Sequence, residues 1–260
     1  MTEHKIKFAI LITGHNTEKW IGRCLLSALS QDYEDFRVVL VDDASTDWTP
    51  TIVESFKVWA RHGGRFKANL RLVTVSNEKR RGALANYAGM MHLCSDDEVV
   101  VMLDGDDQLA DDQVLNRLAR EYADPDVWMT YGSFAYDLES RQPNGDYMGI
   151  CAQLPPDDHT RKTSWCASHL RTFYAWLFKK IDPKDLLYEG KYYKVAWDLP
   201  LMCPMLEMAG PKHARFIPDV LYLYNLVNLI NDCRVYSQEE IQKVVNHVKA
   251  LPIYPLIGER

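Results

Sequence analysis

The most constraining feature of this sequence is a run of five apolar residues, 99–103, that ends in three carboxylates within four positions. Such a run, with three valines and no polar interruption, predicts a strand buried on both faces of a parallel sheet. Asp104, Asp106 and Asp107 follow its carboxyl end, where open α/β sheets bind their ligands. Neighbouring carboxylates repel one another unless a cation lies among them, so the cluster predicts a Mg²⁺ or Mn²⁺ site. The alternative is an acidic turn that only caps the next helix.

Length and charge narrow the classes of protein that this sequence fits. The chain has 260 residues, enough for a large α/β domain, and a formal net charge of −6. An acidic chain is not expected to bind nucleic acid, because binding a phosphate backbone needs a basic surface. The six cysteines are scattered without a C-x-x-C pair, which favours reduced thiols and a cytoplasmic location. The sequence shows neither a signal-peptide pattern nor an apolar run long enough for a transmembrane segment.

Apolar strands and amphipathic helices alternate before the acidic run. Apolar residues at 8–12 predict another buried strand, residues 37–41 and 70–75 predict two further strands, and helical spacing predicts a helix after each. This order, with short loops, calls for a mostly parallel, doubly wound sheet with helices on both faces. The carboxyl ends of parallel strands meet at one edge, so the polar residues there are expected to line one crevice. Besides the three acids, they are Thr13-Gly14-His15-Asn16 and Asp42-Asp43.

The second half of the sequence is less regular, and we expect it to be α+β and to pack on the first half. Turn-forming residues over 137–156 predict a long surface loop. A strand predicted over 215–224 is placed at a sheet edge, because Pro218 interrupts it. The other predicted elements are a strand over 127–132, helices over 168–181 and 198–208, and a last helix opened by a capping box at 237–240.

Three segments resemble, in order and spacing, the successive signatures of family-2 glycosyltransferases of the GT-A fold. They are residues 8–29, then Val41-Asp42-Asp43-Ala44-Ser45-Thr46-Asp47-Trp48-Thr49, then Leu103-Asp104-Gly105-Asp106-Asp107. The resemblance implies an α/β fold of GT-A type, in which residues 1–131 form the nucleotide-sugar-binding half. Residues 132–260 would form the acceptor-binding and catalytic-base half of the same single domain.

The resemblance also implies an activity. A family member would be a metal-dependent, inverting enzyme that moves a hexose from a UDP-sugar to an acceptor hydroxyl. UDP-glucose or UDP-galactose is the donor expected from the family's common usage. The expected acceptor is a glycan or a protein hydroxyl, and a homodimer is left open.

The family's motifs assign the contacts to the donor. Thr13, His15 and Asn16 would lie along the nucleoside. Asp43 would accept the imide N–H of uracil, a donor that cytosine and adenine lack in that form. Further candidates, for which a solvated surface position is the alternative, are Arg80 and Arg81 at the donor and His169 and Arg171 at the donor phosphate or the acceptor.

Under this resemblance the acidic cluster divides into two roles. Asp104 would face the ribose or the sugar, whereas Asp106 and Asp107 would hold Mn²⁺ or Mg²⁺ on the diphosphate. The ion would neutralise the diphosphate and stabilise it as a leaving group. Many relatives have a metal-binding histidine a few residues after the position of 222–225. Here only Asn228, Asn231 and Asp232 follow, so diphosphate and water are expected to complete the coordination sphere.

The catalytic base is expected near the start of a helix in the second half. The segment Val195-Ala196-Trp197-Asp198-Leu199-Pro200 is similar to the family's Glu-Asp motif, with Trp197 in place of the glutamate. Asp198 would deprotonate the acceptor hydroxyl as it attacks the anomeric carbon from the face opposite the diphosphate. The alternative is that Asp198 only caps its helix.

Two other functions stand as alternatives. A sugar-phosphate nucleotidyltransferase also uses acidic metal ligands, but its first strand is normally followed by a glycine-rich loop with Arg and Lys. The segment Thr13-Gly14-His15-Asn16 is not such a loop. A non-catalytic nucleotide-sugar-binding or scaffold protein would have a decayed site. The presence of the acids argues against that, since the sequence retains Asp104, Asp106, Asp107 and Asp198.

Overall fold

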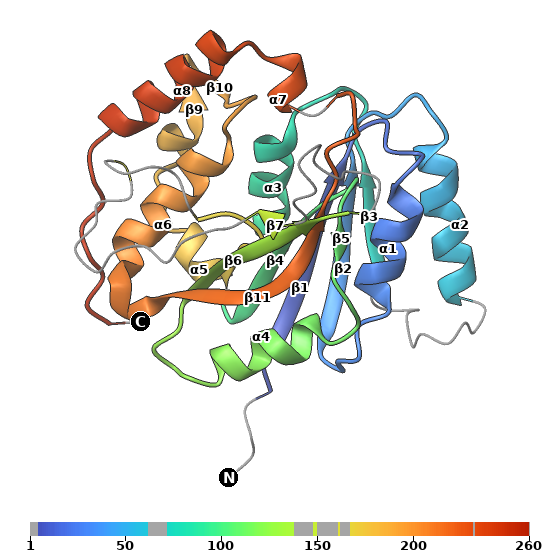
Figure 1. Cartoon of the computed structure of the whole chain (residues 1–260), viewed down its shortest axis with the longest axis horizontal. Helices are drawn as coiled ribbons and strands as arrows, with labels where there is room; N and C mark the ends of the chain where they lie inside the picture. Colours follow the sequence, from blue (N-terminus) through green and yellow to red (C-terminus); the bar gives the residue numbers. More distant parts are fainter. Residues whose placement is uncertain are drawn as a thin grey trace.

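The structure is a computed structural model that describes residues 5–61, 72–137, 148–149, 161, 167–230 and 232–259. Its described strands form one mixed sheet in the order β3-β2-β1-β4-β8-β6-β11-β5, with β7 paired to β6 (Figure 1). A second, two-stranded sheet pairs β9 with β10. The strands are β1 (Lys7–Gly14), β2 (Phe36–Asp42), β3 (Leu72–Ser76), β4 (Glu98–Asp104), β5 (Gln108–Leu109), β6 (Met129–Tyr136), β7 (Met148–Gly149), β8 (Thr172–Tyr174), β9 (Leu187–Tyr188), β10 (Lys191–Tyr192) and β11 (Ala214–Tyr224).

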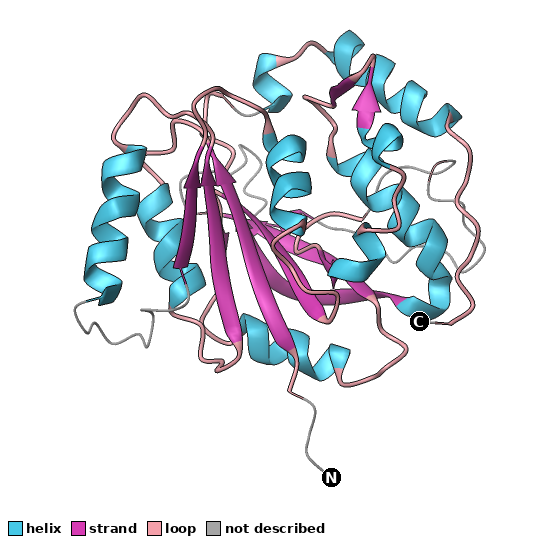
Figure 2. Cartoon of the chain, turned by 180° about the vertical axis from the view of Figure 1, so that it is seen from behind, coloured by secondary structure: helices cyan, strands magenta, loops and turns pink. Residues whose placement is uncertain are grey.

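Helices surround the sheet: α1 and α2 lie at one end, α6 and α8 at the other, and α3 lies between them (Figures 1 and 2). None of the described helices is long and apolar enough to cross a membrane. The helices are α1 (Ile21–Leu29), α2 (Thr49–Arg61), α3 (Ala83–Met91), α4 (Val114–Tyr122), α5 (Ala175–Phe178), the 3₁₀ helix η3 (Pro183–Leu186), α6 (Asp198–His213), α7 (Asp232–Val235) and α8 (Gln238–Ala250).

The predicted parallel strands are confirmed, although β3 at the sheet edge is partly exposed. β1 runs parallel to β2 on one side and to β4 on the other, and β3 continues this part of the sheet beyond β2. Residues 8–12 and 99–103 are all buried. Because the strands are in parallel register, Thr13 lies beside both Val41 and Asp104. The polar strand ends therefore meet at one edge of the sheet, as predicted (Figure 2).

Two glycines allow the ends of β1 and β4 to approach closely. The Gly105 backbone N–H donates a hydrogen bond to the Thr13 carbonyl at 2.9 Å. A Cβ atom on Gly105 would lie 3.0 Å from both that carbonyl oxygen and the Gly14 Cα. A side chain at position 105 would therefore push the acidic cluster away from β1.

The helix predicted over 168–181 is wrong in its first half. Thr172–Tyr174 form β8, which lies between β4 and β6 and pairs antiparallel with both, and only α5 is helical. The buried Thr172 hydroxyl forms hydrogen bonds with Tyr122 (2.7 Å) and Thr130 (2.6 Å). Apolar spacing alone does not distinguish a short buried strand from a helix. Here the pairing with two distant strands makes residues 172–174 a strand.

The strand predicted over 215–224 is present as β11. It runs parallel to β6 and, among the described strands, meets only Gln108–Leu109 of β5 on its other side. Register shifts between Ile217 and Val220 leave Pro218 outside the ladder. Proline removes a ladder donor, so it is accommodated at this irregularity.

Two predicted helix signals are also confirmed. α6 breaks at Gly210, where φ is +62°, a value that favours glycine. α8 opens with a capping box, in which Ser237 Oγ accepts from the Glu240 N–H and the Glu240 carboxylate accepts from the Ser237 N–H at 2.8 Å. The loop predicted over 137–156 lies largely outside the described residues.

Candidate active site

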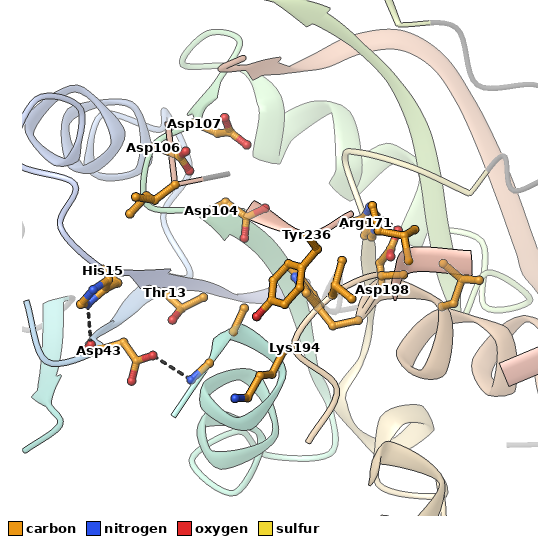
Figure 3. Close-up of a pocket in the computed structure, with 18 of the residues that line it drawn as sticks. Thr13, His15, Asp43, Asp104, Asp106, Asp107, Arg171, Lys194, Asp198 and Tyr236 are labelled. Atoms are coloured by element: carbon orange, nitrogen blue, oxygen red, sulfur yellow. Dashed lines mark hydrogen bonds and ion pairs between the residues drawn. The ribbon is translucent and has the colours of Figure 1, made fainter. Parts of the chain in front are cut away.

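A cavity of about 660 Å³ lies at the edge of the sheet where the parallel strands end (Figure 3). Both halves of the chain contribute to its walls. Of the twelve predicted site residues, all except Asn16 line it: Thr13, His15, Asp43, Arg80, Arg81, Asp104, Asp106, Asp107, His169, Arg171 and Asp198.

Asp43, just after β2, is buried and held by three hydrogen bonds. Its Oδ1 accepts from the Asn77 amide (2.7 Å) and the Arg81 backbone N–H (2.9 Å), and its Oδ2 accepts from the Gly82 backbone N–H (2.8 Å). Burial would raise the pKa of Asp43, but these bonds outweigh it and hold the pKa below its usual value. The ionised carboxylate thus fastens residues 80–82 to the cavity. A carboxylate has about four acceptor sites, which leaves room for about one ligand donor.

The end of β1 and the turn after it present two side chains to the cavity. Thr13 Oγ1 accepts from the Asn86 amide at 3.0 Å. His15 Nδ1 lies 2.9 Å from the Asp43 carbonyl oxygen, and a carbonyl only accepts, so Nδ1 carries a proton in this contact. Asn16 instead accepts from the Thr46 N–H at 2.8 Å and joins this turn to the one after β2. Its contact with a nucleoside stays a prediction.

Neutral donors hold the two acids predicted to bind metal. Asp107 is 2% exposed, and it accepts from the Asn225 backbone N–H at 2.7 Å and from the Tyr222 hydroxyl at 2.5 Å. Asp106 accepts from the Asn228 amide at 2.7 Å. Burial and the neighbouring carboxylates raise the pKa of Asp107 well above its usual value, and burial raises the pKa of Asp106.

This acidic cluster fits a divalent cation. Burial and mutual repulsion disfavour the charged carboxylates, and a cation among them would reverse that effect. Carboxylate oxygens are also the ligands that Mg²⁺ and Mn²⁺ prefer. Among the described residues, no three His, Cys, Asp or Glu side chains are grouped to hold an ion by themselves. Oxygens from a bound ligand or water would therefore have to complete the coordination.

Asp198 lies across the cavity from the acidic cluster, as the first residue of α6 (Figure 3). The buried guanidinium of Arg171 donates to Asp198 Oδ2 at 3.0 Å and lies 5.9 Å from the centre of the Trp197 ring. The Trp197 ring stacks on Tyr87, with centroids 5.3 Å apart and planes inclined by 28°. The Tyr87 hydroxyl donates to Asp104 Oδ1 at 3.0 Å. Contacts thus run from the acidic cluster to Asp198 without a gap.

The remaining candidates differ in exposure. His169 is buried, with its ring stacked on Tyr222 at a centroid distance of 4.3 Å. Burial, reinforced by the charge of Arg171, lowers the pKa of His169 well below its usual value, so the ring is neutral at pH 7. Arg80 and Arg81 have exposed side chains at the cavity, where a guanidinium can bind phosphate.

The prediction missed the residues that hold the acids in place. Asn77 and Asn86 support the ends of β2 and β1, and Tyr222 and Asn228 support the acids after β4. No sequence motif marks these positions, because each acts on a strand end far along the chain. Further lining residues that were not predicted are Arg161, Lys194, Trp197, Tyr224, Asn228, Tyr236 and Lys249.

A comparison of the sequence with models of protein families identifies the family of this chain. The model of glycosyl transferase family 2 matches residues 9–182, which is more than half of the chain. The chain belongs to glycosyl transferase family 2. The predicted family is thus confirmed.

Curated glycosyltransferases match part of the chain in sequence. Poly(ribitol-phosphate) beta-N-acetylglucosaminyltransferase TarS of Staphylococcus aureus is 32% identical over 106 residues, which are 40% of this chain and 17% of TarS. Glycosyltransferase GlyG of Streptococcus pneumoniae is 22% identical over 136 residues, which are 52% of this chain and 41% of GlyG. The match covers less than half the length of either relative.

Solved structures of glycosyltransferases match nearly the whole chain. TarS residues 1–349 with UDP-GlcNAc has a TM-score of 0.65 at 17% identity, over 94% of this chain and 65% of that one. The mannosyltransferase PcManGT of Pyrobaculum calidifontis, with GDP-Man and Mn²⁺, has a TM-score of 0.59 at 19% identity, over 88% and 59%. These likenesses confirm the predicted α/β fold of GT-A type.

Proposed function

We propose that this family-2 protein is a metal-dependent, inverting glycosyltransferase that transfers a hexose from a UDP-sugar to an acceptor hydroxyl. The observation that carries the proposal is the meeting of two sets of acids in one cavity (Figure 3). Asp104, Asp106 and Asp107 come from the end of β4, and Asp198 comes from the start of α6. The cavity, about 660 Å³, is within the usual range for small-molecule sites.

The proposed donor contacts use the strand ends. Thr13 and His15 would lie along the nucleoside, and the remaining acceptor capacity of Asp43 would receive the uracil imide N–H. Arg80 and Arg81 would approach the diphosphate, for which an exposed guanidinium is a suitable partner. UDP-glucose and UDP-galactose are the proposed donors. UDP-GlcNAc, which is bound to TarS, and GDP-Man, which is bound to PcManGT, are further donors to be tested.

Asp106 and Asp107 would hold Mn²⁺ or Mg²⁺, and Asp104 would face the ribose or sugar. When bound, the ion would neutralise the diphosphate and make it a better leaving group. The Asp107 carboxylate already accepts two protein hydrogen bonds, whereas Asp106 accepts one from the Asn228 side chain. Asp106 is therefore the ligand with more free oxygen capacity.

Asp198 would act as the general base. It would take the proton of the acceptor hydroxyl as that oxygen bonds to the anomeric carbon, while the bond from this carbon to the diphosphate breaks on the opposite face. Attack opposite the leaving group inverts the anomeric configuration. The acceptor that we propose is a glycan or protein hydroxyl.

A panel of donors tests this proposal. UDP release is measured from UDP-glucose, UDP-galactose and UDP-GlcNAc, and GDP release from GDP-mannose, each with Mn²⁺ and with EDTA and with candidate acceptors. Asp198→Asn should lower transfer at least 100-fold, the typical contribution of a general base, and spare donor binding. Asp219→Asn, at a surface ion pair with Arg117, is the matched control. Absence of metal-dependent binding or turnover for every donor would favour a non-catalytic protein.

A further inference from the structure

We propose that Trp197 and Arg171 are positioning residues that fix Asp198 relative to the bound donor. The inference rests on the proposed function, in which Asp198 is the base. It concerns the chain of contacts between the two sides of the cavity. The donor side is the ends of β1, β2 and β4 with residues 80–82; the base side is residues 169–171 with residues 196–198.

Tyr87 anchors this chain on the donor side. The residue is fully buried on α3, and its hydroxyl lies 3.0 Å from Asp104 Oδ1 and 3.1 Å from the Leu103 carbonyl oxygen. Burial and the charge of Asp104 raise the pKa of Tyr87 well above its usual value, so the hydroxyl remains a donor. The position of the Tyr87 ring is thus set by the end of β4.

Trp197 connects the Tyr87 ring to the start of α6. Its centroid distance and tilt relative to Tyr87 are those of a favourable aromatic stack. Trp197 is the N-cap residue of α6, directly before Asp198, so placing its ring also places the first turn of that helix. Ala196 before it has φ of +47°, which a residue with a side chain adopts only where its surroundings impose it. The stack on Tyr87 supplies such a constraint.

Arg171 completes the chain on the base side. Its side chain is buried, and a buried guanidinium requires a charged or aromatic partner. Asp198 Oδ2 and the Trp197 ring provide both kinds, whereas the Arg171 Nε has no hydrogen-bond partner among the described residues. The described residues provide no hydrogen bond to Asp198 Oδ1 either. This is the oxygen that would accept the proton. Arg171 thus orients the carboxylate rather than contacting the diphosphate.

The same contacts explain why tryptophan can stand where the family's motif has glutamate. A second carboxylate at position 197 would add charge beside Asp198, but it could not stack on Tyr87. The flat indole fills the space between the phenol ring and the guanidinium. Asp198 keeps its place through packing at residue 197 instead of through another charge.

The experiment compares Trp197→Ala and Arg171→Met with the conservative variants Trp197→Phe and Arg171→Lys. Misplacing a catalytic group by about 1 Å costs roughly 100-fold in rate. We expect Trp197→Ala and Arg171→Met to lower kcat by about that factor, with the KM for donor and the Kd for UDP with Mn²⁺ changed less than about twofold. Trp197→Phe, which keeps a stacked ring, should restore kcat to within about fivefold. Arg171→Lys keeps the charge without the planar fork and should restore it in part.

Two exposed residues provide matched controls, Trp59→Ala on α2 and Arg120→Met on α4, which should leave kcat and KM unchanged. UDP binding by every variant reports a folded donor side, so a loss of transfer is separable from unfolding. Wild-type kcat in Trp197→Ala, or a loss of donor affinity as large as the loss of kcat, would overturn the positioning role alone. A wild-type protein that binds no nucleotide sugar would overturn the proposed function, and this inference with it.

Discussion

The two sides of the cavity are built in different ways. On the donor side, carboxylates lie at the ends of parallel strands and accept hydrogen bonds from backbone amides and neutral side chains, as Asp43 and Asp107 do. On the base side, Asp198 begins a helix and is held by one buried cation and a ring stack. The donor side is therefore fixed by the geometry of the sheet, whereas the base side depends on side chains that meet across distant parts of the chain.

This difference indicates where substitutions should act. A change on the donor side should alter donor binding, together with any effect on stability, because the carboxylates and backbone there also provide the ligand contacts. A change on the base side should alter stability or turnover, because side-chain contacts there hold the backbone. Four tests, from the largest expected effect to the smallest, examine that division.

The largest effect is expected from Glu207→Ala, behind the base side. Glu207 on α6 forms a buried ion pair with Arg161, which also donates to the Val248 carbonyl at 2.7 Å, and Glu207 accepts from the Tyr254 N–H at 3.0 Å. Removing one member leaves an uncompensated buried charge, which costs about 3–5 kcal/mol. Urea unfolding should show that loss in the free energy of unfolding.

A double variant and a surface pair control this result. Arg161→Met with Glu207→Met removes both charges and should recover most of the loss, because well-packed apolar residues replace buried ion pairs at little cost. Glu239→Ala breaks the exposed pair with Lys243 and should change stability by less than about 0.5 kcal/mol. An equal loss of stability in Glu207→Ala and Glu239→Ala would contradict a stabilising role of the buried ion pair between Arg161 and Glu207.

Gly105→Ala should break the close approach of β1 and β4 on the donor side. The new methyl group would meet backbone atoms of Thr13 and Gly14 at 3.0 Å, and overpacking of this kind costs about 1–3 kcal/mol. Metal-dependent UDP binding should weaken as well, because the acidic cluster is displaced. Gly89→Ala on α3, where a Cβ meets nothing within 4 Å, should leave UDP binding unchanged. Normal UDP affinity in Gly105→Ala would show that donor binding does not need the close approach of β1 and β4.

How much of this could be read from the sequence depended on distance along the chain. Residues 99–107 hold both the strand and its acids, so the cluster and its place at the sheet edge were predictable. β8 was not, because its pairing partners lie some 40 to 70 residues earlier in the chain. The bond from Asn228 to Asp106, 122 residues apart, likewise exists only in the folded protein. The bond from Arg171 to Asp198 is of the same kind, and the roles assigned to these residues stay predictions.

Asp43→Asn tests the hydrogen bonds of the donor side and their pH dependence. An amide at this position turns one acceptor oxygen into a donor that faces an N–H, which costs about 1–3 kcal/mol. The pKa of Asp43 is lowered by folding, so its stabilisation is complete above the unfolded-state value of about 3.9 and is lost as pH falls through the folded-state value. The stability gap between wild type and variant should therefore shrink on acidification from pH 6 to pH 3. A gap that does not change with pH would show that the charge of Asp43 is not what matters.

The smallest effect is expected from a pair of alanines in left-handed backbone, one on each side. Ala44 has φ of +60° after β2, and Ala196 has φ of +47° before α6. Glycine removes the steric penalty but adds unfolded-state entropy, so stability should change by less than about 1 kcal/mol in either variant. Ala196→Gly loosens the residue before Trp197 and should lower kcat about threefold with unchanged donor affinity, a small fraction of the loss for a misplaced catalytic group. Ala44 lies beside Asp43, so Ala44→Gly should lower the affinity for the donor instead. The same response from both variants would mean that sheet geometry and side-chain contacts do not divide the cavity as described.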